Sequence, residues 1–325
     1  MSKKRQFAVS LSKEGHNDEA AELLKSAMLE GDINAINDYA VIQEKKGNYD
    51  GATSLYNLAG ILGMPTAIVN LGNLYEHGKG VDQSYVVARL LYQRATKLKD
   101  PLGYFKLSEL YFYGRGVTKD PSKALAILRK GYEIEKSISD RYECAIQLAC
   151  AYDFGHFNEP ADKDKALEYY SVAASKGCPV AYYNAGYIYS GNGDIDKALD
   201  CWMKAGNMGY GDAYSSLFFV YWNGERHIKP DHLLAVSFLN KGLELNSFRA
   251  ILFHADLMLC GDLGEINKEL AIRDIATYLC DCPHKDDYQD IYDQIKEGYI
   301  DQIDWEAIEN NPRKYLEDNN NDIDC

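Results

Sequence analysis

The sequence lacks the long apolar runs that mark a membrane protein or a secreted precursor. Although 46% of its 325 residues are hydrophobic, no run approaches the roughly 18 consecutive apolar residues of a membrane-spanning helix. Near the N-terminus the stretch FAVSL is also shorter than the apolar region of a signal peptide, which takes about 7 to 15 residues. We therefore expect a cytoplasmic protein without a membrane span.

Basic residues are scarce relative to acidic ones. The chain has 35 Lys and Arg against 49 Asp and Glu, which gives a net charge of -14. Proteins that bind nucleic acid need basic surface to neutralise phosphates, so we expect no nucleic-acid partner. An acidic surface either serves solubility alone or also attracts basic partners, and composition leaves both interpretations open.

The cysteines are irregularly spaced, which argues against a regular disulfide framework. Their spacing fits reduced thiols used as small core residues. Cys280, Cys282 and His284 could offer three zinc ligands, but a second ligand pair at the usual distance is missing. We expect no metal and no cofactor. The cysteines are Cys144, Cys150, Cys178, Cys201, Cys260, Cys280, Cys282 and Cys325.

Catalytic and phosphate-binding motifs are also lacking. HGKGV and YGRGV place a cation between glycines, but a phosphate-binding loop would continue with Gly-Lys-Ser/Thr after a strand. ADKDKALE and GDIDKALD alternate aspartates without the glycine turn and later glutamate of a calcium loop, so we interpret them as acidic helix starts. Because no nucleophile, base and orienting group can be assembled from these motifs, we expect no enzyme.

Two columns of residues recur at a nearly fixed interval and predict a repeat architecture. Successive alanines lie 32 to 42 residues apart, an interval typical of stacked structural repeats. Two columns with matching insertions also rarely arise by chance. One column is Ala20, Ala52, Ala88, Ala124, Ala166, Ala198, Ala235 and Ala271. The other is Tyr75, Tyr111, Tyr152, Tyr189, Tyr221 and Met258.

Each repeat predicts two amphipathic helices joined by a loop. In AIVNLGNLYEHGKGVDQSYVVARLLYQRA, Ile68, Leu71 and Tyr75 follow helical spacing, as do the apolar residues around Leu91. Small residues are expected where the paired helices approach closely: the alanine column, Gly72, Ser108, Ala149, Gly186 and Ala255. Glycines are expected to end the first helices with a positive φ: Gly78, Gly114, Gly155, Gly191, Gly224 and Gly261.

The repeats resemble a known family. LGNLYEHGKGVDQSYVVARLLYQRA and LSELYFYGRGVTKDPSKALAILRKG are similar to Sel-one-like repeats (SLR), the variable-loop relatives of tetratricopeptide repeats (TPR). The units at 35–59 and 185–205 have shorter loops and resemble plain TPR. The resemblance implies an all-α fold, a right-handed α-solenoid or superhelix of about eight stacked helix-turn-helix units over residues 1–284. A degenerate first unit lies at about 2–30 and a weak last one at about 250–282.

The region after the repeats departs from the repeat pattern and is expected to have a different role. In residues 285–316, apolar positions including Tyr288, Ile295 and Trp305 suggest short helices with one apolar side. These helices either cap the exposed end of the solenoid, as stacked arrays require, or fold into its groove as a lid. Residues 317–325 form an acidic tail that we expect to be disordered. With both ends protected, the array is expected to be a monomer.

Similarity to TPR arrays implies where a partner would bind. A second stripe on the first helix of each unit would line a concave groove, and Tyr and Trp are favoured anchors there because they bury large areas at low entropic cost. For Phe105, Phe219 and Trp222 the sequence leaves open whether the ring contacts a partner or the neighbouring unit. The stripe also includes Ser190 and Ser215. The partner-binding candidates are Asn73, Glu76, Phe105, Glu109, Phe112, Asp153, Tyr183, Tyr187, Phe219 and Trp222.

We therefore expect a protein-protein interaction scaffold or adaptor that binds an extended peptide or a partner protein without catalysis. The carboxylate clamp of chaperone-binding TPR proteins is not expected, because Glu44 and Glu76 occupy the stripe beside Asn73. A ligand with apolar and basic side chains suits this groove better. One alternative is a bacterial effector or toxin-immunity protein that also acts by binding. A second is an enzyme or a small-molecule binder.

Overall fold

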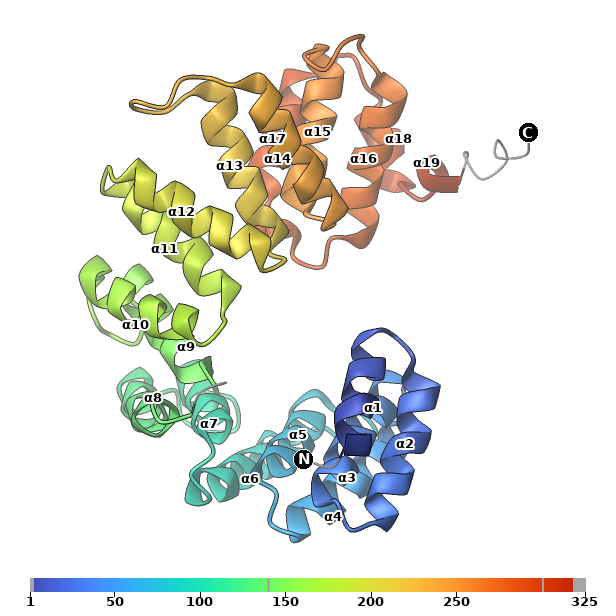
Figure 1. The fold of residues 1–325 in the computed structure, drawn as a ribbon, viewed down its shortest axis with the longest axis vertical. Helices are drawn as coiled ribbons and strands as arrows, with labels where there is room; N and C mark the ends of the chain where they lie inside the picture. Colours follow the sequence, from blue (N-terminus) through green and yellow to red (C-terminus); the bar gives the residue numbers. More distant parts are fainter. Residues whose placement is uncertain (1–2, 139–140, 300, 318–325) are drawn as a thin grey trace. The chain divides into compact units, whose positions relative to one another are not determined.

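The computed structural model describes residues 3–138, 141–299 and 301–317, so residues 318–325 of the expected tail lie outside it. Within these ranges the chain is helical, apart from an isolated bridge between Glu225 and Ile228. The chain divides into two compact units, residues 1–177 (unit 1) and 178–325 (unit 2). Each unit is a stack of helix pairs (Figure 1), which confirms the all-α solenoid fold.

Unit 1 contains five helix pairs, and each pair packs on the next. Its helices are α1 (Lys3–Lys13), α2 (Asn17–Leu29), α3 (Ile33–Lys45), α4 (Tyr49–Ile61), α5 (Pro65–His77), α6 (Tyr85–Lys97), α7 (Pro101–Tyr113), α8 (Pro121–Glu135), α9 (Glu143–Phe154) and α10 (Lys163–Ser175).

Unit 2 contains three further pairs followed by a C-terminal group of shorter helices. Its helices are α11 (Pro179–Gly191), α12 (Ile195–Asn207), α13 (Gly211–Asn223), α14 (His232–Glu244), α15 (Phe248–Cys260), α16 (Lys268–Asp281), η1 (Lys285–Asp287), α17 (Gln289–Gly298), α18 (Trp305–Asn310) and α19 (Lys314–Glu317). None of the helices within the described ranges is both long and apolar enough to cross a membrane.

Local sequence signals set the helix ends. Asp162 and Asp194, from the aspartate-rich stretches, accept hydrogen bonds from backbone N–H groups in the first turns of α10 and α12, which confirms that they start helices. Four of the predicted glycines, Gly78, Gly114, Gly155 and Gly261, end their helices in the left-handed conformation. The prediction for Gly191 was wrong. It is the last residue of α11, and the positive φ, 92°, falls at Gly193 because this connection is shorter.

The alanine column lies where the two helices of each pair meet. All eight of its alanines are 0% exposed, as are Ser108, Ala149 and Ala255 of the first helices. At Gly72 an added Cβ would lie 2.4 Å from the Tyr92 ring, and at Gly186 it would lie 2.4 Å from Nε1 of Trp202. The small residues therefore serve the predicted close approach of paired helices.

A buried hydrogen bond recurs across the helix pairs of unit 1. Four residues after a column alanine, a tyrosine hydroxyl donates to a carboxylate on the paired helix, as in Tyr92 to Glu76 at 2.7 Å and Tyr170 to Asp153 at 3.0 Å. Tyr56 makes the equivalent bond to Glu44 at 2.9 Å. Burial raises the pKa of the Tyr56, Tyr92 and Tyr170 phenols, so they remain protonated donors at neutral pH.

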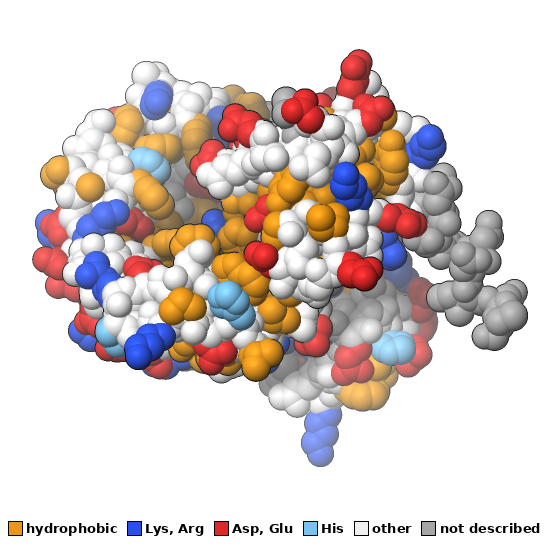
Figure 2. Space-filling model, turned by 90° about the horizontal axis from the view of Figure 1, so that it is seen from above, with side chains coloured by type: hydrophobic (Ala, Val, Ile, Leu, Met, Phe, Trp, Pro, Cys, Tyr) orange, Lys and Arg blue, Asp and Glu red, His pale blue; other side chains and the backbone are white. Residues whose placement is uncertain are grey.

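In unit 2 the C-terminal helices cover the last repeat. Tyr292 and Ile295 of α17 and Trp305 and Ile308 of α18 are buried in one cluster with Tyr278 of α16. The predicted apolar side of this segment therefore packs against α15 and α16. On the face shown in Figure 2, acidic and basic side chains are interspersed, with apolar side chains exposed between them.

Helix α9 is capped by a residue from the preceding helix. Its own N-cap, Tyr142, makes no side-chain cap bond. Instead the fully buried Glu135 carboxylate accepts hydrogen bonds from the N–H groups of Cys144 at 2.7 Å and Ala145 at 2.8 Å. Burial raises the pKa of Glu135, and the two donated hydrogen bonds act against that rise. The carboxyl group thus joins α8 to α9.

We expect Gly186→Ala to lower the free energy of unfolding by about 2 kcal/mol, because the new Cβ overlaps the Trp202 indole. Gly191→Ala, in the same helix, is the matched control, since an added Cβ there meets no atom within 4 Å. Urea unfolding followed by tryptophan fluorescence compares the midpoints. Equal shifts in the two variants would contradict the close approach described here.

Glu135→Ala is expected to lower the free energy of unfolding by about 2 kcal/mol, because it leaves two buried N–H donors at the start of α9 without acceptors. The control is Glu133→Ala, which removes the same charge from an exposed position of α8 paired with Lys136. Thermal unfolding measured by circular dichroism distinguishes them. A Glu135→Ala protein as stable as the control would show that the cap contributes little.

Candidate functional site

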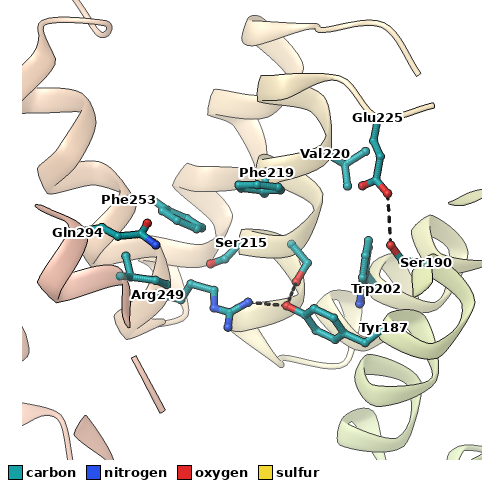
Figure 3. Close-up of a pocket in the computed structure, with 12 residues that line it drawn as sticks. Tyr187, Ser190, Trp202, Ser215, Phe219, Val220, Glu225, Arg249, Phe253 and Gln294 are labelled. Carbon is teal, nitrogen blue, oxygen red and sulfur yellow. Dashed lines mark hydrogen bonds between the residues drawn. The ribbon is translucent and has the colours of Figure 1, made fainter. Parts of the chain in front are cut away.

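Unit 2 contains a cavity of about 340 Å³ between helices α11, α12, α13, α15 and α17 (Figure 3). This volume lies in the range of sites that hold a small molecule or a few side chains of a peptide. Its lining combines aromatic rings, small hydroxyl groups and two charged residues. The lining residues are Tyr187, Ser190, Trp202, Ser215, Ser216, Phe219, Val220, Glu225, Arg249, Phe253, Ile291 and Gln294.

Four lining residues belong to the stripe expected from the sequence. Tyr187 and Ser190 come from α11, and Ser215 and Phe219 come from α13. Phe219 is 53% exposed and Tyr187 is 42% exposed, although both residues are large and aromatic. Phe219 faces Phe253 of α15 with ring centroids 6.4 Å apart. The periodic pattern thus brings two helices of the stripe to one cavity.

The Tyr187 hydroxyl is held by three neighbours. It accepts hydrogen bonds from Tyr183 at 3.3 Å and from the guanidinium of Arg249. A phenol has two acceptor lone pairs and one proton, so the remaining contact, with Ser216 at 3.0 Å, is one in which Tyr187 donates. Ser216 in turn donates to the backbone carbonyl of Asp212 at 3.3 Å. The ring is therefore fixed in place before any ligand binds.

Arg249 is a cavity residue that the periodic pattern missed. It lies in the first turn of α15, one turn before the stripe, and its half-buried guanidinium reaches Tyr187. Its Nε is buried without a hydrogen-bond partner. A local signal existed in FRAILFHADLMLC, because Arg249 is a lone arginine at the start of an apolar helix, where the macrodipole disfavours a cation.

Glu225 supplies a negative charge on a different wall of the cavity. It lies two residues after the end of α13, and its backbone pairs with Ile228 in a short turn. Its carboxylate accepts a hydrogen bond from Ser190 at 3.4 Å. Figure 3 shows Glu225 and Arg249 apart from each other, with Phe219 and Val220 along the wall that α13 forms.

A second polar network lies behind the cavity and ties the C-terminal segment to it. Ser247, the N-cap of α15, donates to the Asp212 carboxylate and accepts from Ser215. The other Asp212 oxygen accepts a hydrogen bond from the Tyr288 hydroxyl at 2.8 Å. One turn later, Ile291 of α17 lines the cavity. The segment after the repeats therefore supplies part of the cavity wall.

The other two candidates of unit 2 lie beside the cavity. Tyr183 is half-buried, and its ring meets Tyr187 edge-on at 5.0 Å. Trp222 stacks on His232 with ring centroids 4.3 Å apart, and it also contacts Phe218. These ring contacts of Trp222 lie within its own helix pair, α13 and α14, which was neither of the alternatives left open. Phe219 remains largely exposed.

In unit 1 the acidic candidates make internal contacts. Glu76 is 3% exposed and receives hydrogen bonds from Tyr92 and Arg115. Asp153 is also buried and holds Tyr170 and Lys163. These carboxylates accept the recurring tyrosine bond, so the structure places them inside the helix pairs.

The Oδ1 of Asn73 lies 2.7 Å from the Tyr92 hydroxyl, where it competes with Glu76 for the one phenol proton, and Asn73 lines a polar cavity of about 560 Å³. Two lysines, Lys45 and Lys79, also line this cavity. Neither lysine belongs to the stripe, so the periodic argument did not place a cation beside Asn73.

The remaining candidates of unit 1 pack against neighbouring side chains. The Phe112 ring lies 4.3 Å from the Phe157 ring at a tilted angle, and Phe105 packs on the same apolar cluster. Glu109 forms an ion pair with Lys106 at 2.7 Å. The cluster on which Phe105 packs contains side chains of α8, in its own repeat, and of α9, in the next repeat.

The cysteine and histidine side chains form no metal site within the described residues. No three of the His, Cys, Asp and Glu side chains there come together as metal ligands, including those of Cys280, Cys282 and His284. The seven cysteines within these ranges form no disulfide bond. Cys325 lies outside the described residues.

Comparison with known structures agrees with the helix-pair fold. A Sel1 repeat protein from Oxalobacter formigenes is 24% identical, with a TM-score of 0.59, over 74% of this chain and 98% of that one. The protective antigen c5321 of uropathogenic Escherichia coli, which displays an SLR fold, is 20% identical, with a TM-score of 0.52, over 91% and 71%. The immunity protein Pa5087 of Pseudomonas aeruginosa is 24% identical, with a TM-score of 0.44, over 62% and 75%. No curated protein sequence matches this chain.

The Sel1 repeat pattern itself matches five consecutive segments that together make up more than half of the chain. They correspond to the helix pairs from α5 to α14, and they include the short-loop unit that also resembles plain TPR. The segments are residues 65–100, 101–133, 143–178, 179–210 and 211–247. Such repeats indicate a protein-interaction scaffold, and the chain belongs to the Sel1 repeat family.

Proposed function

We propose that the protein is a non-catalytic binding scaffold that docks an extended segment of a partner protein in the cavity of unit 2. The observation that supports this most directly is the exposed aromatic wall. Phe219 and Tyr187 leave large ring surfaces open beside Trp202 and Phe253. Exposed apolar surface of this kind is favourable to bury against a partner, and aromatic residues are frequent anchors of binding energy.

The rigidity of the wall also favours binding. Tyr187 is held by Tyr183, Ser216 and Arg249, and the Trp202 indole donates to the backbone carbonyl of Tyr183 at 3.2 Å. Side chains that are already ordered lose little conformational entropy when a ligand docks. The cavity is therefore suited to a specific partner.

The polar groups of the cavity favour recognition over catalysis. The Ser216 hydroxyl donates to a backbone carbonyl, and the Ser215 hydroxyl lies 3.2 Å from Ser247, which itself donates to Asp212. No histidine lies among the residues that line the cavity. A serine nucleophile needs an adjacent base within hydrogen-bond reach, and among the lining serines only Ser190 faces a carboxylate, that of Glu225, over a long 3.4 Å contact.

A role in toxin immunity is a narrower version of the same binding function. The likeness to the Pseudomonas immunity protein, with a TM-score of 0.44, favours neither this role nor a general adaptor. We therefore propose partner binding without specifying the pathway of the partner.

The direct test is selection of binders from a displayed library of random dodecapeptides, using the full chain as bait. We expect the enriched peptides to contain large apolar residues. We expect Phe219→Ala to lower the affinity for a selected peptide at least tenfold, about 1.4 kcal/mol, because it removes the exposed anchor ring. Fluorescence anisotropy with the labelled peptide gives the Kd values.

Leu233→Ala is the matched control for this variant, because Leu233 is an 88% exposed apolar residue of unit 2 that does not line the cavity. We expect it to bind the peptide as the wild-type chain does. A library without enriched peptides would contradict peptide binding. Equal affinities of the two variants would show that the peptide binds outside the cavity.

A further inference from the structure

Arg249 and Glu225 give the cavity two charged ends, and Arg249 has no carboxylate partner. Its guanidinium donates to the neutral hydroxyl of Tyr187, and its Nε is buried without a partner. Arg249 forms no ion pair among the described residues, and the nearby Asp212 accepts hydrogen bonds from Ser247 and Tyr288. A guanidinium remains charged at any physiological pH and has a donor fork that fits a carboxylate. The guanidinium fork is therefore left without a directly bound carboxylate, although Asp212 attracts its charge.

Glu225 shows the same incompleteness with opposite sign. Its carboxylate accepts one weak hydrogen bond, from the neutral Ser190 at 3.4 Å. The chain as a whole carries a net charge of -14, which favours the approach of a cation to this wall. Between the two charged residues lie apolar groups that fit an apolar side chain, namely Phe219, Val220 and Trp202.

We propose that the occupant of the cavity is an extended segment of a partner protein in which an acidic residue and a basic residue flank a large apolar residue. The acidic side chain binds Arg249, the apolar side chain packs on Phe219 and Trp202, and the basic side chain binds Glu225. The two charges then fix the direction in which the segment lies, because the reversed segment would place like charges together. This inference rests on the proposed peptide binding and specifies its partner class.

The test is a double-mutant cycle on a peptide selected from the dodecapeptide library with the wild-type chain. Its acidic residue is changed to the corresponding amide, and both peptides are measured against the wild-type chain and Arg249→Gln. We expect the amide peptide to bind the wild-type chain about tenfold or more weakly, and Arg249→Gln to bind the two peptides within about threefold of each other. Glu225→Gln with the basic residue of the peptide changed to Gln forms the equivalent cycle.

Two further variants distinguish loss of the Arg249 contact from a general effect on folding. Arg273→Glu reverses a charge on the exposed surface of α16, outside the cavity, and is expected to preserve the preference for the acidic peptide. Arg249→Lys keeps the charge without the fork and is expected to keep part of the preference. Circular dichroism checks that each variant is folded. If Arg249→Gln does not fold, the affinities of Arg249→Lys for the two peptides test the contact instead.

The outcomes separate this inference from the function on which it rests. Equal loss of affinity for the amide peptide in the wild-type chain and Arg249→Gln would overturn the contact with Arg249, as would the absence of any loss. Selected peptides without acidic residues would overturn it as well. In each of these cases a strong effect of Phe219→Ala would still support peptide binding, whereas a failed selection would contradict both proposals.

Discussion

The close approach of paired helices at a column of alanines is the constraint on which the rest of the structure depends. Each alanine of the column is fully buried, and where the facing helix carries glycine, as at Gly72 and Gly186, a large ring fills the space. Neither helix of a pair could bury its apolar face alone. This contact recurs in every repeat, so the same sequence positions meet in every helix pair. The side chains at these positions determine which surface each repeat leaves available for a partner.

The difference between the repeats explains why the candidate site lies in unit 2. In unit 1 a tyrosine four residues after the column alanine requires a buried acceptor, and Glu76 supplies it for Tyr92. At the position equivalent to Tyr92 the pair α11/α12 has Trp202, whose indole donates to a backbone carbonyl. The position equivalent to Glu76 is then Ser190, a small residue at the edge of the cavity. The pair that has Trp202 in place of the buried tyrosine is thus the pair that contributes to the exposed aromatic wall of the cavity.

Sequence periodicity was sufficient to predict the fold and part of the candidate site. The alanine and glycine positions followed from the need for close packing, and two residues of the stripe, Tyr187 and Phe219, line one cavity. The periodic pattern could not show that Glu76 accepts a buried hydrogen bond, because that bond depends on Tyr92 of the paired helix. Arg249 and the α17 wall were missed for a related reason: they come from a helix start and a non-repeating segment, where no period applies.

The most direct measurement is a crystal structure of the full chain with a peptide selected from the random library. Our account predicts that the peptide lies between α11 and α15, with an apolar side chain on Phe219 and a carboxylate within hydrogen-bond distance of the Arg249 guanidinium. A peptide bound elsewhere on the chain, with the cavity of unit 2 unoccupied, would contradict it.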